Sequence, residues 1–291
     1  MRFAERPLLT IALGGHALCD PNNPSVTDER VRIQKLTETF RELTKSGFRL
    51  LIVHGNGPQV GRLMVDDLDL DDLDVRVAQT QGELGYLLAD AIGEQAVALV
   101  TSVEVSSEPA SSFKPIGPVL DTPPHEGRCV RHAKGWRRSV PSPIPIRVRE
   151  AEPIRVMSEM CHVIAGGGGG VPVLASGEPV RAVIDKDYTA TLLAIGLNAQ
   201  ALLFATNVDF VYTDFADRPS LPNPSLTTAQ AAALLDSQDW PEGTMEPKLR
   251  AAINFVETLA RPAHICDWTS IVPALQGQAG TILMPTGLCA R

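Results

Sequence analysis

Three short, mainly apolar runs in this chain each end in a cluster of glycines, and this recurrence constrains the fold more than any other feature. Residues 8–13 are followed by two glycines, residues 50–53 by a Gly-Asn-Gly turn, and residues 162–165 by five glycines. Such runs are typical of strands buried in a parallel sheet. Because ligands of α/β proteins bind where these strands end, we expect a ligand site at the carboxyl edge of the sheet.

The second glycine turn lies within the sequence Val-His-Gly-Asn-Gly-Pro-Gln-Val-Gly at residues 53–61. Glycine adopts positive φ and lets backbone N–H groups approach a ligand closely. Pro58 suits the first turn of a helix, where its missing N–H has no partner to lose. A strand, a glycine turn and a helix N-terminus together favour an anion. The alternative is a tight strand-to-helix turn without a ligand, since short glycine motifs occur by chance.

A helix is predicted between the first two strands. Thr27 is expected to cap it and Gly47 to end it. Its apolar side chains recur at helical spacing, at Ile33, Leu36, Phe40 and Leu43. Strand, helix and strand in succession imply a parallel sheet with a right-handed crossover, and therefore an α/β protein.

Further elements follow the same alternation along the chain. Helices are expected over residues 79–97, 189–195, 225–235 and from 242–248 to about 259, and strands over 180–184, 201–205, 263–266 and 281–284. The five glycines at 166–170 are either a flexible linker or a third turn at the sheet edge, and their place between two apolar runs favours the turn.

Composition excludes several classes of protein. A net charge of −8 argues against nucleic acid as a main partner. No leader or membrane span is expected, because the longest apolar stretch, 189–206, is interrupted by Asn198 and Gln200. The five cysteines are scattered without metal or redox spacing, so we expect reduced thiols in a cytoplasmic protein. A catalytic thiol is an alternative that no neighbouring sequence supports.

Residues 106–153 differ from the rest of the chain because they are rich in proline and basic. The cations of this segment are Lys114, Arg128, Arg131, Lys134, Arg137, Arg138, Arg147 and Arg149. A disordered linker is one interpretation. Because the segment lies between two strand-helix regions, we favour an inserted subdomain that covers an anionic ligand.

Two further sequences place lysines where a phosphate would lie. Lys186 stands between Asp185 and Asp187 at the end of an expected strand. This arrangement is either a solvated ion pair or a lysine that stabilises a transferring phosphoryl group and is held by its neighbours. Lys248 stands in the first turn of an expected helix, beside the positive end of the helix dipole.

Taken together, these motifs resemble carbamate kinases of the amino acid kinase family. The resemblance runs in order through nearly the whole chain. Its motifs are Ala-Leu-Gly-Gly at 12–15, residues 54–61, Phe-Lys-Pro-Ile-Gly-Pro at 113–118, Gly-Trp-Arg-Arg at 135–138 with Val-Pro-Ser-Pro at 140–143, the glycine run with 171–173, Val-Ile-Asp-Lys-Asp at 183–187 and Ala-Gly-Thr at 279–281.

The resemblance implies a three-layer αβα sandwich around a mostly parallel open sheet. An N-terminal lobe, 1–175, would bind carbamate or carbamoyl phosphate and contain the lid at about 106–153. A C-terminal lobe, 176–291, would bind ATP or ADP with Mg²⁺. It further implies a homodimer that makes ATP from carbamoyl phosphate and ADP during the breakdown of arginine or purine-derived nitrogen.

Site residues follow from the same resemblance. Lys186 would contact the transferring phosphoryl group, and Asp185 and Asp187 would orient the lysines, with Asp187 also a candidate for Mg²⁺. Lys114 would reach the substrate phosphate from the lid, and Lys248 would hold the nucleotide phosphates. The substrate-binding residues would be Gly14, Gly15, His16, Gly55, Asn56, Gly57, Gly167 and Gly168. The nucleotide-binding residues would be Asp209, Val211, Tyr212, Met245, Pro247 and Lys248.

Several residues depart from the family pattern. His16 replaces an asparagine, Asn207 an aspartate and Glu246 a glycine, while residues 188–191 replace a more aliphatic stretch. A glutamate beside nucleotide phosphates adds repulsion unless Mg²⁺ or an arginine compensates it. Three interpretations stay open: a carbamate kinase, a kinase of the same fold acting on another small acid, or a non-catalytic binding paralogue.

Overall fold

The computed structural model describes residues 2–19, 25–64, 72–123, 127–132, 135–213, 221–237, 240 and 245–287. Within these residues the largest sheet has eight strands. Their spatial order is β14 (Ser225–Thr227), β16 (Thr281–Met284), β15 (Ala263–Asp267), β11 (Ala201–Thr206), β1 (Leu8–Leu13), β2 (Arg49–His54), β9 (His162–Ile164) and β3 (Ala96–Ala98). The β15–β16 pair is antiparallel, and the other neighbours run parallel.

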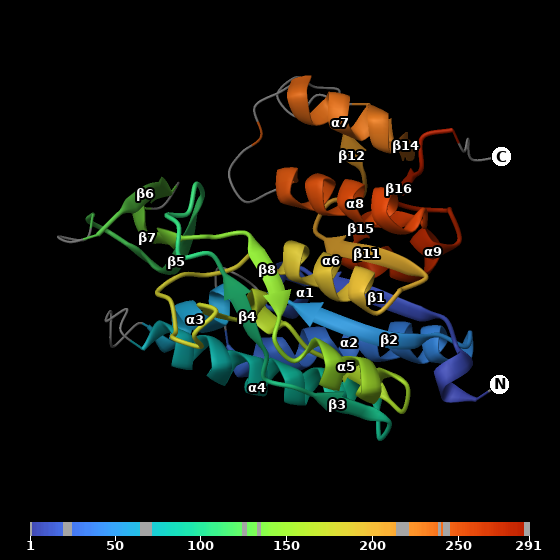
Figure 1. The fold of residues 1–291 in the computed structure, drawn as a ribbon, viewed down its shortest axis with the longest axis horizontal. Helices are drawn as coiled ribbons and strands as arrows, with labels where there is room; N and C mark the ends of the chain where they lie inside the picture. Colours follow the sequence, from blue (N-terminus) through green and yellow to red (C-terminus); the bar gives the residue numbers. More distant parts are fainter. Residues whose placement is uncertain are drawn as a thin grey trace.

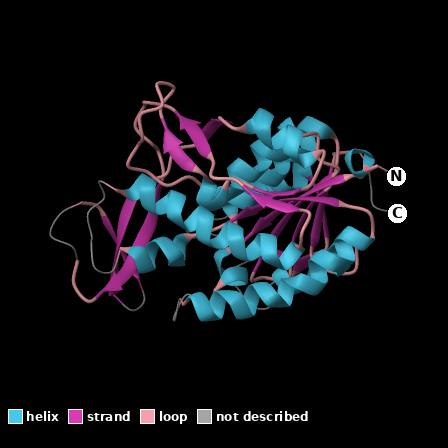
Figure 2. Ribbon diagram, turned by 90° about the horizontal axis from the view of Figure 1, so that it is seen from below, coloured by secondary structure: helices cyan, strands magenta, loops and turns pink. Residues whose placement is uncertain are grey.

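Helices cover both faces of this sheet, as Figure 2 shows. On one face lie α2 (Val26–Lys45), α4 (Leu73–Ile92) and α9 (Ile271–Leu275), and on the other α5 (Ala151–Ser158), α6 (Lys186–Gly196), α7 (Thr228–Ser237) and α8 (Glu246–Leu259). Alternate side chains of each strand enter opposite cores. In β1, Leu9 and Ile11 pack with α2 and α4, whereas Leu8 and Ala12 belong to the core of α6 and α8. The three-layer αβα prediction is therefore confirmed.

The strand order changes direction at β1. Helix α2 leads from β1 to β2 on one side, while β11 pairs with β1 on the other. Such a reversal opens a crevice beyond the carboxyl ends of the strands. The glycine turns after β1, β2 and β9 therefore lie at the edge where this topology favours a ligand.

A small sheet projects from one end of the molecule, on the left of Figure 1. It consists of β5 (Phe113–Leu120), β7 (Gly135–Pro141) and β6 (Cys129–His132) in antiparallel order. We call this sheet the lid. The rest of the proline-rich segment behaves differently, because β8 (Pro145–Val148) pairs with β4 (Ser102–Val105), which also pairs with β10 (Val171–Val173). A short ribbon of β12 (Val211–Tyr212) and β13 (Pro222–Asn223) completes the sheets described.

Several predicted elements need correction. Residues 180–184 form no strand; they follow an isolated bridge between Val173 and Pro179 and lead directly into α6. The helix expected over 79–97 begins earlier, at Leu73, and ends at Ile92, because Gly93 adopts a φ of 112° that a helix does not permit. Ser25, whose side chain accepts from the Asp28 N–H, caps α2 in place of Thr27. The segment predicted as helix over 225–235 starts as strand β14.

The remaining predictions for strands and helices are confirmed by β1, β2, β9, β11, β15, β16, α2, α6 and α8. None of the described helices combines the length and apolar character needed to cross a membrane.

Candidate active site

Two glycine turns and a lysine meet at the carboxyl edge of the main sheet. The Gly14 N–H donates to the Ala205 carbonyl at 2.8 Å, and the Gly55 N–H donates to the Leu13 carbonyl at 2.9 Å. A Cβ atom added to Gly55 would lie 3.3 Å from the Gly15 nitrogen and 3.5 Å from Cδ of Lys186. The turns after β1 and β2 therefore approach one another closely, with the Lys186 side chain alongside.

Close approach, and not positive φ, is what these two turns require of glycine. Gly14, Gly15, Gly55 and Gly57 all lie outside the left-handed region, so none of them uses the freedom of glycine to adopt positive φ. A Cβ on Gly14 would lie 3.0 Å from the Ala205 oxygen, whereas one on Gly57 would meet nothing within 4 Å. Gly15 and Gly57 begin the short helices α1 (Gly15–Leu18) and α3 (Gly57–Leu63), and Pro58 occupies the first turn of α3 as predicted.

The third glycine run is buried and packs beneath the second turn. Gly166, Gly168, Gly169 and Gly170 have positive φ, which supports the interpretation as a turn over that of a linker. A Cβ on Gly167 would lie 2.4 Å from Nε2 of His54, and one on Gly168 would lie 2.1 Å from Nδ2 of Asn56. The run is thus shaped to hold the side chains of the Gly-Asn-Gly turn.

Those two side chains are themselves fixed. Nδ2 of Asn56 donates to Oγ1 of Thr80 at 2.9 Å, and Nδ1 of His54 lies 3.0 Å from the Gly55 carbonyl oxygen. Burial lowers the pKa of His54 to about 4, although the bond to Gly55 opposes this shift. His54 is therefore a neutral donor that holds the turn at neutral pH.

Three lysines converge on the Asp-Lys-Asp sequence at the start of α6. Asp185 is the N-cap of α6, and its Oδ1 accepts from the Asp187 N–H at 2.9 Å. Nζ of Lys186 lies 2.6 Å from Oδ1 of Asp187, and Nζ of Lys248, from the first turn of α8, lies 3.2 Å from its Oδ2. Nζ of Lys114, from lid strand β5, lies 2.5 Å from Oδ2 of Asp185. These five side chains form what we call the lysine cluster.

Burial makes this cluster electrostatically strong. Burial opposes ionisation of Asp185, but Lys114, Lys186 and Lys248 outweigh it and hold the pKa of Asp185 well below its usual range. Burial also lowers the pKa of Lys186, against the attraction of Asp187. The pKa of Lys248 is raised, because Asp187 and Asp185 outweigh the burial that would lower it. Three cations around two carboxylates leave net positive charge where an anion is expected.

The lid contacts the main body at this site. Ile116 and Val140 of the lid pack with Val60 and Met64 on and after α3, and the Val183 N–H donates to the Pro141 carbonyl at 3.0 Å.

Three other basic residues of the segment make contacts away from the lysine cluster. Arg128 and Arg131 stack on Phe113 and Trp136, and Arg147 pairs with Glu104. Lys134 lies outside the described residues.

The predicted nucleotide-binding residues lie in two segments of the chain, one after β11 and one at the start of α8. Val211 and Met245 belong to one buried cluster, and Met245 is the N-cap of α8, which begins at Glu246 and Pro247. The Tyr212 hydroxyl donates to Oδ1 of Asp209 at 2.8 Å, which raises its pKa. Residues 241–244, which contain the glycine and threonine of the motif before Met245, lie outside the described residues.

The departures from the family pattern differ in their surroundings. Oε1 of Glu246 accepts from Nε of Arg250 at 2.9 Å, so an arginine of the same helix compensates this glutamate. Asn207 follows β11, and its Oδ1 lies 3.4 Å from the Thr206 hydroxyl. The backbone of His16 belongs to α1, but its side chain lies outside the described part of the structure.

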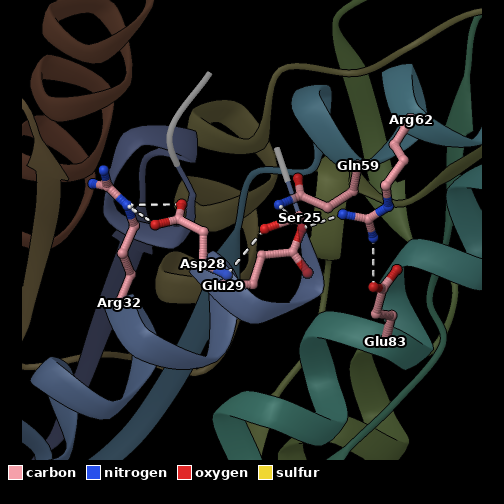
Figure 3. Close-up of polar contacts among 7 residues, drawn as sticks. All are labelled: Ser25, Asp28, Glu29, Arg32, Gln59, Arg62 and Glu83. Carbon is pink, nitrogen blue, oxygen red and sulfur yellow. Dashed lines mark hydrogen bonds and ion pairs between the residues drawn. The ribbon is translucent and has the colours of Figure 1, made fainter. Parts of the chain in front are cut away.

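Sequence reasoning missed one polar network behind the site. Glu29 is fully buried and binds Gln59 and Arg62 of α3, and Arg62 also binds Glu83 of α4 (Figure 3). A signal was present, because Glu29 precedes Ile33 by four positions and so continues the apolar stripe of its helix.

The thiols of Cys19 and Cys266 are buried, and burial raises the pKa of each to about 12. Neither thiol is therefore a nucleophile at neutral pH.

Comparison with known proteins agrees with this geometry. Residues 8–267 match the model of the amino acid kinase family. Carbamate kinase of Halobacterium salinarum is 37% identical over 94% of this chain and 97% of its own, and that of Escherichia coli K12 is 34% identical over 94% and 98%. A structure of carbamate kinase from Giardia lamblia bound to AMP-PNP superposes with a TM-score of 0.86 at 25% identity, covering 97% of this chain and 99% of that one.

The fold and the matches define an ATP-dependent kinase. The chain belongs to the amino acid kinase family, and it is a carbamate kinase-like phosphotransferase.

Proposed function

We propose that this protein transfers a phosphoryl group reversibly between carbamoyl phosphate and ADP, giving ATP and carbamate, which yields ammonia and CO₂. The observation that supports this most directly is the position of Asp187. Its two carboxylate oxygens contact the amino groups of Lys186 and Lys248, which come from two different helices. The Lys186 side chain also lies beside the glycine turn at Gly55. Cations directed at one buried point are what phosphoryl transfer requires, because charge develops on the transferring oxygens.

Each lysine has a distinct role in this proposal. The bond between the phosphorus and the carbamoyl carboxyl oxygen breaks, and a bond from phosphorus to a β-phosphate oxygen of ADP forms. Lys186, held by Asp187 and next to Gly55, would stabilise the transferring group. Lys248, in the first turn of α8, would bind the ADP phosphates, where the helix dipole also favours an anion. Lys114 would bind carbamoyl phosphate from the lid and exclude water.

The glycine turns would position the smaller substrate. The N–H groups of Gly14 and Gly55 already donate to carbonyls of neighbouring strands. These two glycines would therefore not donate to the substrate, and their lack of a side chain would let it approach the backbone closely. Gly15 and Gly57, at the starts of α1 and α3, would direct N–H groups towards the anion. His16 and Asn56 would border this site, with Gly167 and Gly168 supporting it from below.

Magnesium fits this arrangement as a partner of the nucleotide. Among the described residues, no three His, Cys, Asp or Glu side chains are grouped so as to hold a metal by themselves, and both oxygens of Asp187 face lysines. Mg²⁺ commonly binds through substrate phosphates with one or two carboxylates. It would therefore arrive with ADP, with Asp187 as the nearest candidate ligand, and would neutralise phosphate charge.

The predicted lobes 1–175 and 176–291 would meet between β1 and β11, which pair in parallel in the main sheet. In this proposal the first lobe with its lid binds carbamoyl phosphate, and the second, through Asp209, Val211, Tyr212, Met245 and Pro247, binds the nucleotide. A homodimeric state and a role in arginine breakdown stay predictions that rest on the resemblance. A cytoplasmic location stays a prediction that rests on the scattered cysteines.

An assay of substrate choice tests the proposal. Purified protein with ADP and Mg²⁺ is given carbamoyl phosphate or acetyl phosphate, and ATP is measured by a coupled reaction. A second series supplies ATP with a panel of small carboxylic acids and measures ADP. ATP formed from carbamoyl phosphate, and much less from acetyl phosphate, supports the proposal. Turnover with another acid alone would instead identify a different acceptor, and binding of ADP without turnover in either series would indicate a non-catalytic protein.

A further inference from the structure

A buried polar network fixes helix α3 from behind. Glu29, in the first turn of α2, has no exposed surface. Its Oε1 accepts from Nε2 of Gln59 at 3.1 Å and from Nη1 of Arg62 at 2.7 Å. Nη2 of Arg62 donates to Oε1 of Glu83 on α4 at 2.5 Å. In Figure 3 Arg62 reaches between the two glutamates, so α3 is joined to both α2 and α4.

The opposite side of α3 contacts the lid, and its beginning forms part of the candidate site. Val60 and Met64 pack with Ile116 and Val140 of the lid. α3 begins at Gly57, two residues after Gly55, which lies against Lys186. A displacement of α3 would therefore move the Gly-Asn-Gly turn and the surface on which the lid rests at the same time.

Stability alone does not explain this network. Oε2 of Glu29 and Oε1 of Gln59 are buried and have no hydrogen-bond partner among the described residues. Burial raises the pKa of Glu29, although Arg62 and Gln59 oppose the shift. Unpaired buried acceptors reduce stability, and a buried ion pair often contributes no more than apolar packing would. Glu29 therefore adds little to the free energy of unfolding. Its main effect is to fix the positions of Gln59 and Arg62.

We propose that Glu29 is a positioning residue for the phosphoryl transfer: by holding Gln59 and Arg62 it sets the position of α3, and through α3 that of the Gly-Asn-Gly turn and of the lid. This inference rests on the proposed function for its kinetic consequence, but its structural consequence is independent of any reaction. A residue that only joins helices would affect the melting temperature and leave the local order of the turn and the lid unchanged.

The test compares Glu29→Ala and Glu29→Gln with Asp28→Asn. Asp28 is the matched control, because its ion pair with Arg32 belongs to the same helix and lies on the other side of it in Figure 3. Hydrogen exchange is measured without substrates at a temperature where all variants are folded. In Glu29→Ala, peptides covering 55–64 and 113–120 should exchange about tenfold faster, while α8 is unchanged. Glu29→Gln, which keeps an acceptor and the side-chain size, should show a smaller effect, and Asp28→Asn none.

Kinetics give the second measurement. Glu29→Ala should raise KM for carbamoyl phosphate about tenfold and leave KM for ADP within about twofold, because α8 does not contact α3 through this network. Exchange like that of the wild type in 55–64 and 113–120 would overturn the inference, and so would an equal rise of both KM values. If the wild-type protein does not use carbamoyl phosphate, the proposed function fails, and the exchange experiment still decides the role of Glu29.

Discussion

The amino group of Lys114 lies 2.5 Å from Oδ2 of Asp185, a residue 71 positions further along the chain. Lys114 belongs to the lid, whereas Asp185 caps the helix that begins with Lys186. One carboxylate therefore connects the lid to the residue proposed to stabilise the transferring group. This ion pair consequently couples the position of the lid to the charge of the candidate site.

Replacing Lys114 tests this coupling. Lys114→Met should lower kcat/KM for carbamoyl phosphate by about 100-fold, because a cation directed at the phosphate is lost. The melting temperature should fall as well, because the buried carboxylate of Asp185 loses one of the lysines that keep it ionised. Arg147→Met is the control, because it removes another ion pair of the same segment, at 60% exposure, and should leave the rate unchanged. Equal rates in both variants would remove Lys114 from the mechanism.

The pair Glu246–Arg250 predicts a reciprocal effect on nucleotide binding. Because Arg250 already compensates Glu246, Glu246→Gly should change the Kd of ADP by no more than about twofold. Arg250→Met leaves the glutamate uncompensated beside the phosphates and should weaken ADP binding about fivefold. The double variant should recover wild-type affinity in calorimetry. If Glu246→Gly alone strongly weakened binding, the glutamate would have a direct role, for example towards Mg²⁺.

Glycine 168 is predicted to be indispensable for packing. Its φ is 65°, and a Cβ atom there would lie 2.1 Å from Nδ2 of Asn56, which is bonded to Thr80. Gly168→Ala should therefore destabilise the protein by about 2–3 kcal/mol in urea unfolding. Gly82→Ala, at an exposed position of α4 with open space around it, should stabilise by about 0.5–1 kcal/mol. A neutral Gly168→Ala would mean that Asn56 is not held in this way.

Three buried histidines predict a loss of stability in mild acid. Burial lowers the pKa of His54, His162 and His264 to about 4, from an ordinary value of 6.5. Each histidine binds a proton in the unfolded chain before it does so in the folded one. The contribution of these histidines to the free energy of unfolding is thus fully present above pH 6.5 and is lost as the pH falls from 6.5 towards 4. Each histidine accounts for a loss of up to about 1.4 kcal/mol per pH unit.

Urea unfolding between pH 7.5 and 5 measures this effect. Glu29 has the opposite effect on stability in acid. Its raised pKa makes the folded state bind a proton more tightly than the unfolded chain does, which stabilises the protein as the pH falls. The comparison is therefore made between wild type and His264→Gln, at a position in β15 away from the lysine cluster. The variant should show a shallower slope, and parallel slopes would contradict the assignment of a low pKa to His264.

Local pattern predicted most of the main sheet, because its buried strands are short apolar runs and those of β1, β2 and β9 lead into glycine turns. It failed where a long-range contact decides the structure. Residues 180–184 look like a strand, yet the Val183 N–H bonds to Pro141 of the lid, which no local pattern reveals. The start of the segment 225–235 is recruited as strand β14 by pairing with β16 at the end of the chain.

The candidate site was predicted as a set of residues, but its geometry was not. The sequence placed Lys186 between two carboxylates, and the structure adds that Asp187 also contacts Lys248 while Asp185 contacts Lys114. These pairs join residues that are far apart in the chain, so spacing does not encode them. Glu29 was missed for a different reason: it belongs to no motif, and its importance follows from burial and from its partners on α3.

The measurement that tests the central claim most directly is ATP formation from carbamoyl phosphate, ADP and Mg²⁺ by wild type, Lys186→Met and Lys35→Met. Lys35 is an exposed residue of α2 and serves as the control. Wild type and Lys35→Met should form ATP at equal rates, and Lys186→Met should be slower by about 1,000-fold with an unchanged circular dichroism spectrum. ATP formed by Lys186→Met at the wild-type rate, or no ATP from the wild-type protein, would contradict the account.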